Sequence, residues 1–127
     1  MHEKDAKIVV KPWGREVWLR VPTEEEMLTG RGYCLKIIHL NRGEKSSLQY
    51  HERKSETQYI IEGQAEIWLE DDIGKIKKSI MGPGEFFNVS TGKTHRVIAL
   101  TDLVLAEAST PEINDVVRVH DDYGRGS

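Results

Sequence analysis

Short runs of β-branched and aromatic residues recur along the whole chain, and each run ends near Gly, Pro, Asn or Asp. Runs of roughly four to eight residues with turn residues between them are typical of antiparallel strands. Thr23 and Glu26 have the spacing of a capping box, so residues 23–29 are the one expected helix. The pattern predicts an all-β sandwich or barrel with one short helix. The expected strands are 8–10, 16–20, 33–40, 46–51, 58–62, 65–70, 75–80, 86–89, 95–100, 103–108 and 116–120.

Size and charge limit the class of protein. The 127 residues suit a single domain, 1–127, with its own hydrophobic core. The net charge of −3 and the lack of a basic stripe argue against a nucleic-acid partner. No apolar run approaches the length of about 20 residues that a membrane-spanning helix needs, and the N-terminus lacks the apolar segment of a signal peptide. The single Cys34 excludes an internal disulfide and is typical of the reducing cytoplasm, where we expect the protein.

Four residues have side chains and spacing that suit a metal site: Gln49, His51, Glu56 and His95. Gln49 and His51 are two residues apart, so a strand places them on one face. Two imidazoles, a carboxylate and an amide oxygen form a mixed nitrogen and oxygen set, which suits Zn, Fe, Mn, Co or Ni better than Ca or Mg. We therefore expect one divalent ion from this group of metals. The alternative is coincidence among polar strand residues.

The order of these residues resembles the two motifs of the cupin superfamily. The first motif reads Gly43-x5-Gln49-x-His51-x4-Glu56-x6-Gly63, and the second reads Gly84-x5-Ser90-x-Gly92-x2-His95. The resemblance implies a single-domain cupin barrel, the double-stranded β-helix or jelly-roll fold. This chain departs from the motifs at three positions, since the family has His, Pro and Asn where it has Gln49, Ser90 and Ala99.

The Gln-x-His pair is similar to that of the phosphomannose isomerases, whose zinc is held by Gln, His, Glu and His. This resemblance makes zinc the first choice for the divalent ion. Residues 11–15 (KPWGR), 47–49 (SLQ), 114–118 (NDVVR) and 122–125 (DYGR) resemble segments of the type II enzymes, the C-terminal isomerase domain of bifunctional mannose-1-phosphate guanylyltransferase/isomerase proteins. The resemblance implies a metal-dependent aldose–ketose isomerase, with conversion of mannose 6-phosphate to fructose 6-phosphate as the type reaction. A family aromatic residue and two histidines are missing, since Arg53, Thr57 and Gln58 stand in their places.

Further site residues follow from the same resemblance. Glu107 shares a strand face with Leu103 and Leu105, and it is either a general acid/base or a structural carboxylate paired with a cation. Arg118 resembles the family's active-site arginine. Lys36 and Ser47 are similar to residues that hold the phosphate of the sugar, and otherwise they are an ordinary strand lysine and hydroxyl.

The remaining expectations concern function, assembly and surface charge. The alternative function is a non-catalytic cupin that binds or senses a sugar or small metabolite, since one fold hosts many functions. A metal-dependent oxygenase is less suited to the ligand set, because those cupins usually present three histidines and a glutamate. We expect a homodimer, because the N-terminal strands need a partner edge, with Trp13, Trp18 and Trp68 in the core or near the interface. Arg53, Lys54 and Arg96 are expected on a solvated surface.

Overall fold

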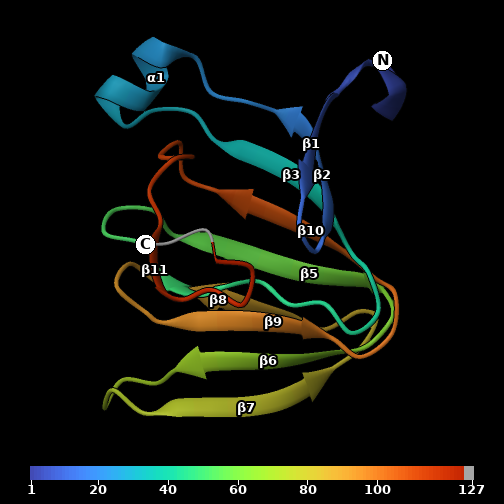
Figure 1. Ribbon diagram of the computed structural model, residues 1–127. Helices are drawn as coiled ribbons and strands as arrows, with labels where there is room; N and C mark the ends of the chain where they lie inside the picture. The colour runs from blue at the N-terminus through green and yellow to red at the C-terminus, as the bar shows by residue number, and fades with distance from the viewer. Residues whose placement is uncertain (125–127) are drawn as a thin grey trace.

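The computed structural model describes residues 1–124 and consists of two antiparallel sheets with one short α-helix (Figure 1). The all-β prediction is confirmed. A 3-10 turn, Glu3–Asp5, precedes the first strand and has no counterpart in the predicted elements. The elements are β1 (Lys7–Lys11), β2 (Gly14–Arg20), α1 (Glu24–Thr29), β3 (Cys34–Leu40), β4 (Leu48–Tyr50), β5 (Glu56–Glu62), β6 (Ala65–Glu70), β7 (Ile76–Met81), β8 (Phe86–Val89), β9 (His95–Ala99), β10 (Leu103–Ser109) and β11 (Val117–His120).

The two sheets pack face to face around the core. One sheet has the order β1-β2-β3-β10-β5-β8 and the other has the order β11-β4-β9-β6-β7. In Figure 1, β10 and β5 lie above β9, β6 and β7. The core takes apolar side chains from the inner faces of both sheets, as sandwich packing requires. Among them are Ile38, Ile60 and Leu105 from the first sheet and Ile67 and Val97 from the second.

The inward-facing side chains of the neighbouring strands β3, β10 and β5 change from apolar at one end of the sheet to polar at the other. Buried residues alternate with partly exposed ones on β3 and β10, so the inward positions can be read from the sequence. The register places Glu107 on β10 opposite Lys36 on β3 and opposite Gln58 on β5. All three side chains are buried. The inner space therefore has an apolar end and a polar end, and the candidate site lies at the polar end.

The predicted helix is confirmed with its cap. The Thr23 side chain accepts the Glu26 N–H and the Glu26 carboxylate accepts the Thr23 N–H, which completes the capping box. Gly30 ends α1 in the left-handed conformation. No helix within residues 1–124 is long and apolar enough to cross a membrane.

Gly63 makes the tight connection between β5 and β6. Its φ is +85°, a conformation that favours glycine, and an added Cβ atom would lie 2.2 Å from the carbonyl oxygen of Asp102. A side chain at position 63 would therefore strain the backbone and clash with the connection between β9 and β10.

Candidate metal centre

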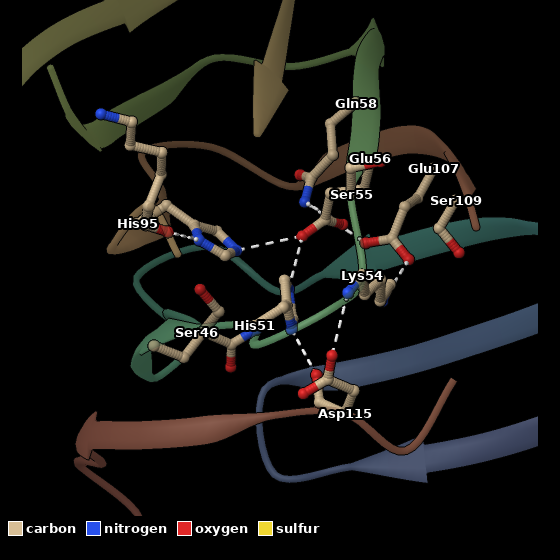
Figure 2. Close-up of polar contacts among 12 residues, drawn as sticks. Ser46, His51, Lys54, Ser55, Glu56, Gln58, His95, Glu107, Ser109 and Asp115 are labelled. Atoms are coloured by element: carbon tan, nitrogen blue, oxygen red, sulfur yellow. Dashed lines mark hydrogen bonds and ion pairs between the residues drawn. The ribbon is translucent and has the colours of Figure 1, made fainter. Parts of the chain in front are cut away.

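His51, Glu56 and His95 converge on one buried point (Figure 2). His51 directly follows β4, Glu56 begins β5 and His95 begins β9, so the cluster joins both sheets. The Nε2 atoms of His51 and His95 lie 2.8 and 3.1 Å from the same oxygen, Oε1 of Glu56. The three ligand atoms lie within 4.8 Å of one another, and each residue is at most 5% exposed.

Backbone carbonyl groups fix how the two imidazoles are oriented. Nδ1 of His51 donates to the carbonyl of Asp115, and Nδ1 of His95 donates to the carbonyl of Lys93 at 3.0 Å. A carbonyl only accepts, so in a neutral ring the hydrogen is on Nδ1 and the lone pair of Nε2 faces the cluster. His95 Nε2 is buried and makes no well-directed hydrogen bond within residues 1–124. Lone pairs of two nitrogens and a carboxylate directed at one point repel one another unless a cation lies between them, so the residues fit a divalent metal ion.

Gln49, the fourth expected ligand, lies close to this cluster. It is the register partner of His95 on β9 and of Arg118 on β11, and it lines the same cavity as both histidines. Its Oε1 atom accepts a hydrogen bond of 2.5 Å from the hydroxyl of Ser47. Ser47 is 1% exposed, so in this conformation it contacts Gln49 rather than the cavity.

A cavity of about 550 Å³ opens beside the cluster. Its size falls within the range of small-molecule sites. Both sheets, the β1–β2 hairpin and the segment before β11 contribute to its walls. Of the residues expected in the site, six line it: Lys36, Gln49, His51, His95, Glu107 and Arg118.

Glu107 belongs to a buried polar network next to the cluster. Its carboxyl group lies 3.5 Å from Lys54 Nζ and 3.3 Å from Gln58 Nε2, and the same Gln58 nitrogen lies 3.2 Å from Glu56. Burial raises the pKa of Glu107 well above its usual range, the negative charge of Glu56 raises it further, and Lys54 opposes both effects. Burial also favours the neutral form of Glu56, but its contacts with the Glu107 carboxyl group and with the His51 and His95 rings outweigh burial and hold the Glu56 pKa well below its usual range. Of the two carboxyl groups, Glu107 therefore has the higher pKa and is the stronger base, while Glu56 favours the ionised form.

The two cations expected to hold an anion differ in their surroundings. Lys36 is buried, with Nζ 3.5 Å from Glu16 and 4.5 Å from the ring centre of Trp18. Arg118 lies on β11 with its Nε atom buried, and within residues 1–124 that atom has no hydrogen-bond partner. Arg118 therefore has unused hydrogen-bonding capacity beside the cavity.

The expectation that Lys54 and Arg96 are solvated is wrong, since each is 5% exposed. Lys54 reaches Glu107, while Arg96 donates to the Ser46 carbonyl and to Asp122. All three pairings join residues far apart in sequence, so no local signal reveals them. Gln58, two positions after Glu56 on the same strand face, was detectable from strand alternation. Arg125, part of the family-like C-terminal segment, lies outside the described residues.

Comparison with known proteins agrees with this geometry. Residues 36–107 match the family described as the Cupin domain. The chain is 29% identical over 122 residues to mannose-1-phosphate guanylyltransferases of Escherichia coli and Salmonella typhimurium. Each match covers 92% of this chain but only 23% of the relative, so the chain spans about a quarter of their length.

Solved structures of oxalate decarboxylases share the fold. The Bacillus subtilis enzyme superposes with a TM-score of 0.76 at 18% identity, over 94% of this chain and 31% of that chain. The Lactobacillus farciminis enzyme gives 0.74 at 14% identity, over 94% and 35%. A further Bacillus subtilis structure, described by its Mn(II) centres, gives 0.74 at 17% identity, over 100% of this chain and 34% of that chain. Identities this low support the architecture alone.

Proposed function

Because the chain belongs to the cupin family, we propose that it uses the metal centre of that fold as an aldose–ketose isomerase acting on a phosphorylated hexose. One observation carries the proposal: the two histidines of the His51–Glu56–His95 cluster line a single cavity together with a second carboxyl group, Glu107, and with Arg118. The similarity to proteins named mannose-1-phosphate guanylyltransferases supports a sugar phosphate as the ligand. Zinc is the proposed ion, and manganese is the alternative that the oxalate decarboxylase structures suggest.

Each residue has a role in this proposal. A divalent ion held by Gln49, His51, Glu56 and His95 supplies Lewis-acid stabilisation of negative charge on the sugar oxygens. The ionised form of Glu107, which Lys54 stabilises at 3.5 Å, accepts the proton from C2 and returns it to C1, while the hydroxyl proton of O2 passes to O1. Arg118 and Lys36 hold the phosphate.

Solvent deuterium exchange tests the isomerase proposal. Metal-loaded protein is incubated in D₂O with a panel of hexose 6-phosphates, and deuterium at C2 is measured by NMR. We expect incorporation that requires the metal and falls by about 10²–10⁴ in Glu107→Gln, the usual contribution of a positioned acid/base, while bound metal is retained. Glu24→Gln, which removes an exposed carboxyl group on α1, is the matched control and keeps full exchange.

The same panel separates catalysis from simple binding. If the metal-loaded wild type binds a hexose phosphate, loses that binding in Arg118→Gln and yet exchanges no deuterium, the isomerase proposal is wrong. The protein is then a sugar-phosphate binding module built on the cupin fold.

A further inference from the structure

The segment between β10 and β11, residues 110–116, is held against the loop that carries the candidate ligands; we call it the strap. The Asp115 carboxylate accepts three backbone N–H groups of that loop, from Glu52 at 3.0 Å, Arg53 at 2.6 Å and Lys54 at 2.9 Å. All three donors lie between the candidate ligands His51 and Glu56. A charged acceptor makes stronger hydrogen bonds than a neutral one, so Asp115 fixes the course of the loop.

The main chain of the same residue contacts a candidate ligand directly. The carbonyl oxygen of Asp115 accepts the hydrogen of His51 Nδ1, and Figure 2 shows His51 between Asp115 and Glu56. Side chain and backbone of Asp115 thus act together, because the carboxylate anchors the strap and the anchored strap presents the carbonyl to the ring. His95 is oriented independently, through the carbonyl of Lys93.

The other end of the strap is also attached to the ligand loop. The N–H of Thr110 donates to the Ser55 carbonyl and the N–H of Ser55 donates to the Thr110 hydroxyl, each at 3.1 Å. Between these attachments, Ile113, Asn114 and Asp115 line the cavity. The strap is therefore both a wall of the cavity and a support of the ligand loop.

We propose that Asp115 is the positioning residue of the metal centre, which orients His51 toward the ion and holds the loop between His51 and Glu56. The inference rests on the proposed metal site and adds a residue to it. Partners of this kind, which bind the second nitrogen of a ligand histidine, typically change metal affinity by about 10–100-fold. Substitution of Asp115 is therefore expected to weaken metal binding without removing any ligand.

The test measures zinc affinity by competition with a chromogenic chelator. We expect Asp115→Asn to weaken binding by about 10–100-fold. Asp102→Asn is the matched control, because the Asp102 carboxylate also accepts a backbone N–H, that of Arg42 at 2.9 Å, but does so at the opposite end of β10. Its affinity should stay within about twofold of the wild type, since it contacts none of the ligands.

A spectroscopic measurement separates positioning from general structural damage. Nitrogen NMR of the metal-free protein reports which ring nitrogen carries the hydrogen, and we expect Asp115→Asn to change the His51 signals and leave the His95 signals unchanged. Thr110→Val, which removes a hydrogen bond at the other end of the strap, is the second variant if Asp115→Asn does not fold, and a selective change at His51 is again expected.

Unchanged affinity and unchanged His51 signals in a folded variant would overturn the inference. Failure of the wild type to bind zinc or manganese would instead refute the proposed metal centre itself.

Discussion

Nζ of Lys54 lies 3.5 Å from Oε2 of Glu107, and the two side chains are only 6% and 8% exposed. The pKa of Glu56 is lowered and that of Glu107 is raised, so Glu56 is the carboxylate that balances Lys54 and Glu107 is the group that takes up a proton first. With Glu107 protonated, the charges of Lys54 and Glu56 balance each other within this buried group.

Loss of the lysine should therefore destabilise the metal-free protein strongly. Lys54→Met leaves a buried carboxylate without its cation, a change that costs about 3–5 kcal/mol. Glu107→Gln should be much milder, because an amide replaces a neutral acid. Urea unfolding measures both, with Lys77→Met as the control, since the exposed Lys77–Asp71 pair is expected to contribute less than about 1 kcal/mol. Equal destabilisation by Lys54→Met and Lys77→Met would contradict the balanced network.

Metal removal should lower the thermal stability of the protein. An ion that binds only the folded state stabilises it by about 2.7 kcal/mol when its free concentration is 100 times Kd. Thermal unfolding with zinc, with manganese and with a chelator measures this increment. His95→Ala should abolish it, whereas His39→Ala, outside the cluster, should retain it. An increment that survives in His95→Ala would place the ion elsewhere.

The turn at Gly63 provides a stability test that is independent of the site. Gly63 and Gly84 have φ values of +85° and +88°, so an alanine at either position is strained by roughly 1–2 kcal/mol. Only at Gly63 does the added Cβ meet a backbone atom, the Asp102 oxygen at 2.2 Å; at Gly84 nothing lies within 4 Å. Gly63→Ala should therefore cost about 1–3 kcal/mol more than Gly84→Ala in chemical unfolding. Equal losses would show that the backbone relaxes around the contact.

His39 should make stability depend on pH. Burial lowers the pKa of His39 and Arg15 lowers it further, while Glu3 and Glu62 act in the opposite direction. The unfolded chain then binds more protons than the folded state below about pH 6.5, so the free energy of unfolding falls as pH falls from there toward the lower folded-state pKa. His39→Gln should lack this component. Urea unfolding at a series of pH values gives the wild-type-minus-variant difference, and a difference that does not change with pH would contradict the prediction.

The outer edge of β1 should pair with a second copy of the chain. β1 is an edge strand, and its Ile8 and Val10 are 48% and 82% exposed. Sedimentation should give twice the 14.5 kDa chain mass for the wild type and for Ile73→Lys, which alters an exposed turn residue. Val10→Lys should shift the protein to the monomer. A wild type that sediments only as a monomer at micromolar concentration would disprove the dimer.

Strands such as β3, β8 and β10 could be predicted because they bury alternate side chains, and this period is visible in the sequence. Residues 65–70 and 86–89 coincide with β6 and β8. The prediction of a strand over 46–51 was too long, since β4 includes only Leu48–Tyr50. Ser46 and Ser47 instead use their side chains to bind the β9 backbone and Gln49, and these contacts depend on tertiary neighbours.

The candidate ligands could be predicted from motif spacing, whereas their supports could not. Lys54 and Glu107 are 53 positions apart, and Asp115 lies more than 60 positions from the loop it binds. Such pairs depend on strand order and register, which a sequence pattern does not encode locally. The sequence near Lys54 therefore predicts a surface residue, although Lys54 is buried against Glu107 from a distant strand.

The placement of the three ligands on both sheets has a mechanical consequence. His51 directly follows β4 and His95 begins β9, and both strands belong to the five-stranded sheet, whereas Glu56 begins β5 of the six-stranded sheet. An ion bound at this point would therefore cross-link the two layers. Any opening motion that separates the layers at their polar end must first break ligand bonds. Metal loading should therefore slow amide hydrogen exchange in β5 and β9 together, while β7, at the far edge, exchanges at the same rate with or without the ion.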